Sequence, residues 1–177
     1  MRRALDGLYA FAGALAAGCV FAILALMVWA SLGRAFAWRV GWVNDVVSWL
    51  CAAAAFLGMA WSFRNGDFVR VTLLLETVRG PTRRILEVAS LVIAALATGY
   101  LAWWAVRFTW ESWAFNEIAN NMVAIPIWIP QASFALGTVI LLVAVLDDCL
   151  SVLRGREPSY TTRVAQRHAQ GDFSQDL

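Results

Sequence analysis

The chain has 177 residues, of which 61% are hydrophobic, and a mean hydropathy of +0.65. This composition is too apolar for a soluble domain, and the length is too short for two domains. The net charge of +2 hides an uneven distribution, because four long segments contain no Asp, Glu, Arg, Lys or His.

These uncharged segments cover residues 8–33, 46–63, 88–106 and 118–146. A helix needs about 20 predominantly apolar residues to cross the hydrocarbon core of a bilayer. An ionised side chain at mid-bilayer costs roughly 2.5–3.5 kcal/mol even on a lenient insertion scale. The pattern therefore predicts an all-α membrane protein with four transmembrane helices, at about residues 8–32, 43–64, 83–107 and 126–148. The first segment is longer than the apolar region of a signal peptide, so we treat it as a span.

A short turn on one side of the membrane connects the first two predicted spans. Span one ends at Gly33-Arg34, and residues 34–41 lead into span two. Asp45 lies in the first turn of span two, where a carboxylate is favourable beside the positive end of the helix dipole. An Arg34–Asp45 ion pair would also tie the outer ends of these two spans together.

A short amphipathic segment separates spans two and three. Over residues 68–79 the apolar side chains follow one arc of a helix with a period of 3.6, and Asp67 is well placed as its N-cap. This segment is too short to cross the bilayer, so it predicts a helix lying flat on the cytoplasmic surface. A soluble helix packed on a cytoplasmic domain is the alternative, but the chain offers no such domain. The residues expected to set this region against lipid headgroups are Arg64, Asp67, Arg70, Leu74 and Arg79.

Span four is bounded by prolines at its start and acids at its end. Pro126 and Trp128 open it, and proline is tolerated in a first helical turn. Asp147-Asp148 mark its exit and are expected to be solvated, although their position beside the cytoplasmic surface would also suit a contact with a basic partner. We predict one four-helix membrane domain over residues 1–153 and a polar, poorly ordered tail over residues 154–177.

The arginines predict the orientation of the chain in the membrane. Eleven of the fourteen lie before span one, between spans two and three, or after span four, whereas Arg34, Arg39 and Arg107 lie on the other side. The positive-inside rule therefore places both termini and the central connection in the cytoplasm. Indole rings favour the opposite membrane interface, where they predict an anchoring belt or, alternatively, a face that docks another subunit. The tryptophans at this boundary are Trp29, Trp38, Trp42, Trp110, Trp113 and Trp128.

The sequence lacks the residue patterns of a catalytic or cofactor site. Its three cysteines are isolated and its one histidine, His168, lies in the tail, so redox pairs, zinc sites and paired haem ligands are not predicted. No phosphate-binding loop, catalytic triad or metal motif appears. We therefore expect no enzyme activity, no cofactor and no nucleic-acid partner. Pumps and ion-coupled carriers usually keep ionisable groups inside the membrane, and the uncharged segments hold none.

Several short motifs occur in an order that resembles a known family. They are Leu32-Gly33-Arg34-Ala35-Phe36, Trp42-Val43-Asn44-Asp45, Phe56-Leu57-Gly58-Met59-Ala60, Arg64-Asn65-Gly66-Asp67-Phe68-Val69-Arg70-Val71 and Ile125-Pro126-Ile127-Trp128, followed by Gly137. Over roughly residues 1–155 the chain resembles the small membrane subunit of tripartite ATP-independent periplasmic (TRAP) transporters, the DctQ-like family. It departs from many members by having Asp45 in place of a glutamate and Asp67-Phe68 where a histidine is common.

The resemblance implies an auxiliary role in the bacterial inner membrane. In such transporters a large multi-span permease binds sodium ions and moves the substrate, and a periplasmic binding protein transiently delivers an organic anion, commonly a carboxylate or sulfonate. The small subunit would brace the permease among membrane lipids and help to dock the binding protein. A Leu74→Asp substitution would then impair assembly. The residues expected to organise the outer face or contact a partner are Arg34, Trp42, Asp45, Pro126 and Trp128.

Two other function classes serve as alternatives. A four-span membrane enzyme or redox protein would need thiol, histidine or cofactor chemistry. A stand-alone small exporter usually requires a carboxylate embedded in the membrane, which the uncharged segments do not supply. The scaffold subunit is therefore the leading hypothesis.

Overall fold

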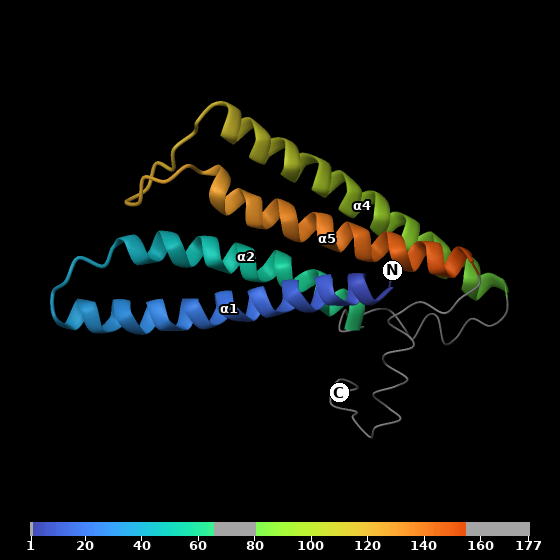
Figure 1. Ribbon diagram of the computed structural model, residues 1–177, viewed down its shortest axis with the longest axis horizontal. Coiled ribbons are helices and arrows are strands. Elements are labelled where there is room, and N and C mark those ends of the chain that lie inside the picture. The colour runs from blue at the N-terminus through green and yellow to red at the C-terminus, as the bar shows by residue number, and fades with distance from the viewer. Residues whose placement is uncertain (1, 66–80, 155–177) are drawn as a thin grey trace, which may run out of the picture.

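The computed structural model describes residues 2–65 and 81–154. Within these ranges the regular structure is helical, apart from one isolated bridge between Ile118 and Pro126. Each described helix is long and apolar enough to cross a membrane, which confirms the prediction of an all-α protein with four potential spans. The helices are α1 (Arg2–Ala35), α2 (Trp42–Asn65), α4 (Pro81–Ala114) and α5 (Trp128–Leu153) (Figure 1).

One predicted element falls outside the described residues. The expected surface helix over residues 68–79 lies there, together with Asp67, Arg70, Leu74 and Arg79. All of the predicted tail except Arg154 lies outside them as well. These expectations stay predictions.

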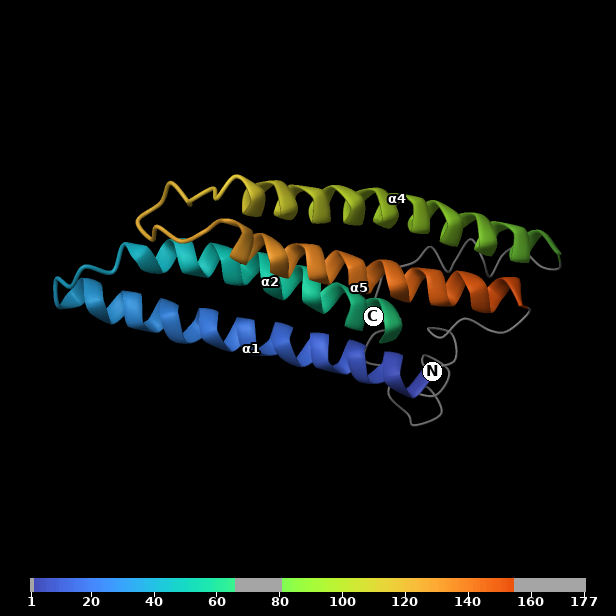
Figure 2. The same cartoon turned by 45° about the horizontal axis from the view of Figure 1, so that its top comes forward.

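The described helices lie side by side in one layer (Figures 1 and 2). Helix α1 packs on α2, α2 packs on α5, and α5 packs on α4. The order across the layer is therefore α1–α2–α5–α4, which places the last helix of the chain inside the layer and α4 at an edge. Burial follows this order, because 56% of the most apolar stretch of α5 is buried, against 28% in α2 and 11% in each edge helix.

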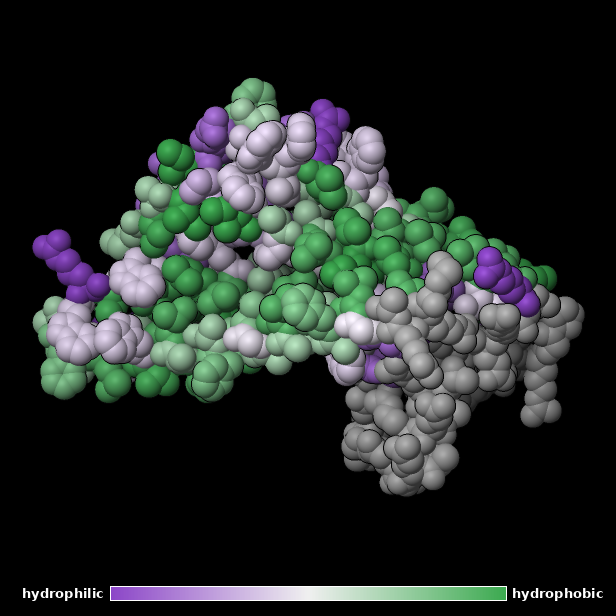
Figure 3. Space-filling view, in the orientation of Figure 1, coloured by the Kyte–Doolittle hydropathy of each residue, from purple (hydrophilic) through white to green (hydrophobic). Residues whose placement is uncertain are grey.

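The two ends of this layer differ in what they carry. The start of α1, the end of α2, the start of α4 and the end of α5 share one end, which we call the terminal end (Figure 1). The connections over residues 36–41 and 115–127 share the other, which we call the loop end. Figure 3 shows hydrophobic residues over the middle of the visible face and hydrophilic residues toward both ends. An open layer exposes large apolar side chains, as at Phe21 and Leu96, and lipid solvates these as well as another helix would.

At the loop end, α1 and α4 each finish in a tight C-terminal cap. After α1, the Trp38 N–H donates to the Gly33 carbonyl (2.8 Å), and Ala37 between them adopts a φ of 55°. After α4, Asn116 adopts a φ of 50° in a similar turn. Both are Schellman-type caps in which Ala and Asn occupy the left-handed position that usually holds glycine.

Helix α4 is longer than the third predicted span. It continues to Ala114, past the expected boundary at residue 107. An ion pair joins Arg107 Nε to Glu111 Oε1 (2.8 Å) with the (i, i+4) spacing that stabilises a helix in water. The charged residues that marked the end of the predicted span are therefore compatible with a further, exposed stretch of helix.

Helices α2 and α5 approach each other very closely at Gly137. A Cβ atom at this position would lie 2.5 Å from the Phe56 carbonyl carbon and 2.7 Å from the Phe56 oxygen. The Phe56 ring meets the Phe134 ring edge-on, with centroids 4.3 Å apart. Helix association in lipid depends on such close packing of small residues, because no hydrophobic effect drives it there.

We expect Gly137→Ala to destabilise the protein by about 1–3 kcal/mol, the usual cost of overpacking, because the added methyl meets backbone atoms that cannot move aside. The midpoint of SDS-induced unfolding in detergent micelles, followed by circular dichroism, measures this loss. Gly18→Ala is the matched control, because a Cβ there meets nothing within 4 Å. Equal midpoints for the two variants would contradict the close contact between α2 and α5.

Candidate functional site

An arginine at the end of α2 is surrounded by three aspartates from two other helices. Arg64 Nη2 lies 3.0 Å from Asp6 Oδ1, and Arg64 Nε donates to the same oxygen at 3.3 Å. Arg64 Nη1 lies 3.2 Å from Asp147 Oδ2 and 3.7 Å from Asp148 Oδ1. The Arg64 side chain is 6% exposed, so these contacts lie mostly out of reach of solvent. We call Asp6, Tyr9, Arg64, Asp147 and Asp148 the Arg64 cluster.

The helix order brings this cluster together. Asp6 lies near the start of α1, Arg64 in the last turn of α2, and Asp147 near the end of α5, so all three reach the terminal end. A cation in the last turn of α2 also interacts favourably with the negative end of the helix dipole. The planar guanidinium has five N–H donors, which lets one arginine contact carboxylates from two directions.

Tyr9 forms the apolar side of the cluster. The Arg64 guanidinium carbon lies 5.5 Å from the centre of the Tyr9 ring, within the range of a cation–π contact. Tyr9 is 1% exposed and belongs to the main hydrophobic core with Ala60 and Val145. Within the described part of the chain its hydroxyl has no hydrogen-bond partner. The ring therefore joins the ionic cluster to the packed interior of the layer.

The chemistry of the cluster favours a structural tie between helices. Its five residues carry carboxylates, a phenol and a guanidinium, and no group of three or more metal-ligating side chains occurs in the described part of the chain, residues 2–65 and 81–154. Asp6 and Asp148 make interactions in addition to those with Arg64. A buried charge is costly unless it is paired, so the arrangement holds α1, α2 and α5 in one register.

The structure places two predicted features differently from the sequence analysis. Arg64 was expected to face lipid headgroups, but its guanidinium lies among carboxylates and is nearly buried. Asp147-Asp148 were expected to be solvated, but Asp148 is 1% exposed and Asp147 pairs with Arg64. The partners lie 58 and 83 residues apart in sequence, so no local pattern connects them. The one signal in the sequence was position along the membrane normal, since all these charges lie just outside the uncharged segments, at the ends predicted to share one side of the membrane.

The outer residues singled out by sequence lie at the loop end, where one of them makes a defining contact. Asp45 Oδ2 accepts a hydrogen bond from the Met122 backbone N–H at 3.0 Å, which ties the start of α2 to the connection over residues 115–127. The ion pairs among the described residues do not include the expected Arg34–Asp45 pair. Arg34 is exposed in the last turn of α1. That prediction was wrong because Asp45 turns toward the other connection.

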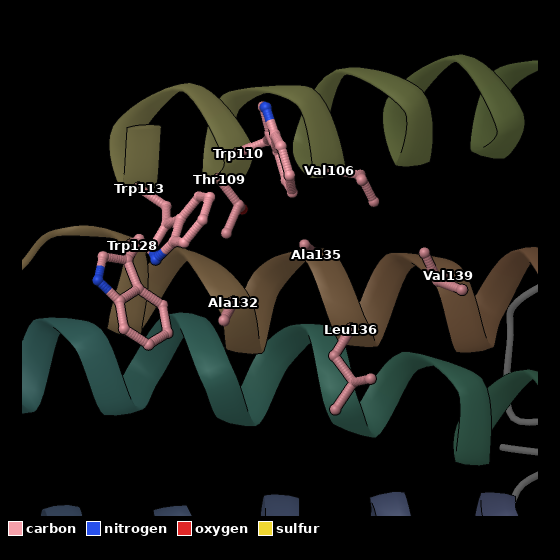
Figure 4. A pocket seen from close by; sticks show the side chains of 9 residues that line it. All are labelled: Val106, Thr109, Trp110, Trp113, Trp128, Ala132, Ala135, Leu136 and Val139. Atoms are coloured by element: carbon pink, nitrogen blue, oxygen red, sulfur yellow. The ribbon is translucent and has the colours of Figure 1, made fainter. Parts of the chain in front are cut away.

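The remaining outer residues take different positions. Trp42 begins α2 and is partly exposed, whereas Pro126 pairs with Ile118 in the isolated bridge. Trp128 begins α5 and lines an apolar groove with Trp110 and Trp113 of α4 (Figure 4). The structure therefore does not gather the predicted outer residues into one site.

The connection over residues 115–127 is folded back on itself. The Ala119 N–H donates to the Ile125 carbonyl (2.9 Å), and the Ile127 N–H donates to the Glu117 carbonyl (3.0 Å). The Ser112 hydroxyl donates to Glu117 Oε2 at 2.8 Å, which joins this turn to the end of α4. These bonds give the loop end a defined shape outside the helices.

Comparison with protein families gives a match over most of the chain. The family described as tripartite ATP-independent periplasmic transporters, DctQ component, matches residues 23–155. The chain belongs to the DctQ family. This finding confirms the resemblance read from the motifs and makes the chain a small permease subunit of a TRAP transporter, a transport family and not an enzyme family. Together with four apolar helices, membership fits a multi-pass protein of the inner membrane.

The family match covers only part of the Arg64 cluster. Arg64, Asp147 and Asp148 lie within the matched residues, whereas Asp6 and Tyr9 precede them. A search of curated proteins found no matching sequence. The α2 and α5 residues of the cluster thus lie within the matched residues, and its α1 residues do not.

We expect Arg64→Met to destabilise the subunit by roughly 3 kcal/mol, because it removes the nearly buried cation that contacts Asp6, Asp147 and Asp148. This value is at the lower end for a broken buried pair, since Asp6 and Asp147 keep some access to solvent. The same SDS unfolding experiment measures it. The control is Arg107→Gln, which removes an exposed (i, i+4) pair and should change stability by no more than about 0.5 kcal/mol. Similar small losses in both variants would show that the cluster does not hold the helices together.

Proposed function

We propose that this DctQ subunit is a non-catalytic scaffold for a large permease that imports an organic anion. The observation that carries the proposal is the open single layer of helices. A substrate path through a membrane protein needs an interior, and a single layer encloses none. The stretches of helix between the two ends also carry no Asp, Glu, Arg, Lys or His that could coordinate an ion or a carboxylate. The transport path must then lie in a neighbouring chain.

The single layer of helices is also suited to supporting a larger neighbouring protein. Its most buried helix, α5, is clamped to α1 and α2 through Arg64, while both faces and both edges stay available to lipid or protein. Energy coupling by sodium and a carboxylate or sulfonate substrate follow from the family resemblance and belong to the partner chains. The two alternative classes, a membrane enzyme and a stand-alone exporter, gain no support from any group of side chains at the described sites.

The orientation follows from charge. We place the terminal end in the cytoplasm, because most arginines of the sequence lie before α1, between α2 and α4, or after α5. The loop end then faces the periplasm, where the binding protein delivers its substrate. Trp38, Trp42 and Trp110 fall at this end, as expected for a membrane interface.

The periplasmic connection is a candidate contact for the binding protein. Met122 and Phe115 are 79% and 76% exposed, more than any other large hydrophobic residue of the described chain. They lie beyond the ends of α4 and α5, on the side that this orientation turns to the periplasm, and exposed apolar groups in water commonly mark protein contacts. The Asp45–Met122 hydrogen bond holds this surface in place.

The first experiment tests the division of labour. We expect the subunit alone in proteoliposomes to show no sodium-driven uptake of labelled organic anions, and a tagged subunit to bring a larger multi-span permease with it from native membranes in mild detergent. Arg107→Gln is the control for the tag experiment, since it alters only an exposed pair on α4. Uptake by the subunit alone would overturn the scaffold assignment.

The second experiment tests the periplasmic contact. We expect the double substitution Phe115→Glu and Met122→Glu to raise the binding-protein concentration needed for half-maximal uptake severalfold, because charges replace apolar contact groups. Recovery of the permease should stay unchanged. Asn120→Glu is the matched control, since it adds a charge to an exposed position of the same connection. An unchanged concentration dependence would place the binding-protein contact elsewhere.

A further inference from the structure

A long apolar groove runs between α4 and α5 toward the loop end. Its volume is about 430 Å³, and it is lined by Val106, Trp110 and Trp113 of α4 and by Trp128, Ala132 and Val139 of α5, among others (Figure 4). The small side chain of Ala132 faces the groove opposite the large indoles, which leaves the hollow between the two helices. The groove belongs to the layer's surface and not to the Arg64 cluster, which lies at the opposite end.

Apart from the indole N–H groups, the lining offers a ligand only apolar surface. The only hydroxyl on it belongs to Thr109, which donates back to the Ala105 carbonyl of its own helix at 2.8 Å. The remaining lining side chains are alkyl groups and indoles. A hydrocarbon is therefore the kind of ligand whose burial this surface favours, since apolar packing is all that it offers.

The length of the groove corresponds to one leaflet of the bilayer. Val139 follows Trp128 by eleven residues of α5, which is about 16 Å along a helix with a rise of 1.5 Å per residue. Half of a hydrocarbon core of about 30 Å is close to the same length. A side chain from a neighbouring protein helix would fill only a few ångströms of such a groove, whereas an extended acyl chain would follow it from end to end.

The indoles set the depth of the groove in the membrane. Trp113 and Trp128 stand together at its loop end, and the opposite end is formed by Val106 and Val139 (Figure 4). Tryptophan favours the boundary between headgroups and hydrocarbon, where its N–H finds acceptors such as ester carbonyls. The groove thus begins where the acyl chain of a phospholipid leaves its glycerol backbone and ends near the middle of the bilayer.

We infer that this groove binds one acyl chain of a phospholipid from the leaflet at the loop end. The bound chain fills the joint between α4 and α5, and its headgroup lies in the interface beside Trp113 and Trp128. The inference requires that the helices span a bilayer, but it does not depend on the scaffold role in transport. A negative result in the uptake experiments leaves it standing, and its own failure leaves the scaffold proposal standing.

The test uses the full chain in lipid nanodiscs that contain a phosphatidylcholine with a photoreactive diazirine on its acyl chain. After illumination, peptide mass spectrometry counts the adducts along the sequence. We expect adducts on the groove residues of α4 and α5 to exceed severalfold those around Phe21, a highly exposed residue on the lipid-facing edge of α1. Ala132→Phe fills the groove and should reduce the groove adducts severalfold, with adducts around Phe21 unchanged.

Two controls keep the result decisive. Leu146→Phe adds an aromatic ring at another exposed position of α5, nearer the terminal end and away from the groove, and should leave the groove adducts unchanged. The unfolding midpoint of Ala132→Phe is measured in parallel, and Ala132→Leu serves as a smaller filling substitution if the midpoint falls. Equal labelling of the groove and the α1 edge would show that the groove contacts only ordinary boundary lipid, and it would overturn the inference. Loss of groove labelling when the permease is added would also overturn it, since protein would then occupy the groove.

Discussion

The cost of placing charge in hydrocarbon constrains the rest of this structure. No Asp, Glu, Arg, Lys or His lies in the middle of the described helices, so charged interactions can form only at their ends. At the terminal end, the nearly buried Arg64 side chain contacts carboxylates from both α1 and α5. An ion pair that contributes little to stability at an exposed surface matters more once it is buried, because removing one partner takes a contact from a charge that solvent hardly reaches.

Between the two ends of the layer, close packing and not charge determines how the helices associate. Membrane helices gain little by turning apolar surface inward, since lipid solvates that surface equally well. The contact between α2 and α5 at Gly137 and Phe56 depends instead on backbone approach, which only a small residue allows. The Arg64 ion pairs and the Gly137–Phe56 contact both join α2 to α5. Together they explain how a single layer of helices keeps a defined order without a closed core.

The sequence predicted the features that depend on residue composition. It missed those that depend on which neighbouring helix or loop a side chain faces. Uncharged segments located the four helices, and motif order identified the family, because both signals are local. The order α1–α2–α5–α4 was not predictable, since lipid-exposed and helix-facing positions have similar residues and leave no amphipathic stripe to read.

The individual contacts show the same division. Asp45 was correctly assigned to the first turn of a helix, but its partner is a backbone N–H at Met122, far along the chain. Arg64 was read as a headgroup contact because it ends a span, and its burial follows only from the neighbours that the fold supplies. A helix that continues to Ala114 was cut short in the prediction because charged residues end a membrane span but do not end a helix.

The two joints of α5 therefore differ in kind, and this difference bears on how the subunit is used. Toward α1 and α2, α5 is held by ion pairs and by the Gly137 contact, both of which specify one geometry. Toward α4, the joint includes apolar packing, since Leu91 of α4 belongs to the same hydrophobic cluster as Ile140 and Val145 of α5, and the groove beside Trp113 is lined by alkyl groups and indoles. Apolar packing in lipid is non-directional and can be shared with an acyl chain, so the α4–α5 joint can tolerate a ligand that the α2–α5 joint would exclude. The ion pairs and the Gly137 contact thus define how α1, α2 and α5 pack on one another, whereas α4 packs on α5 beside an apolar groove.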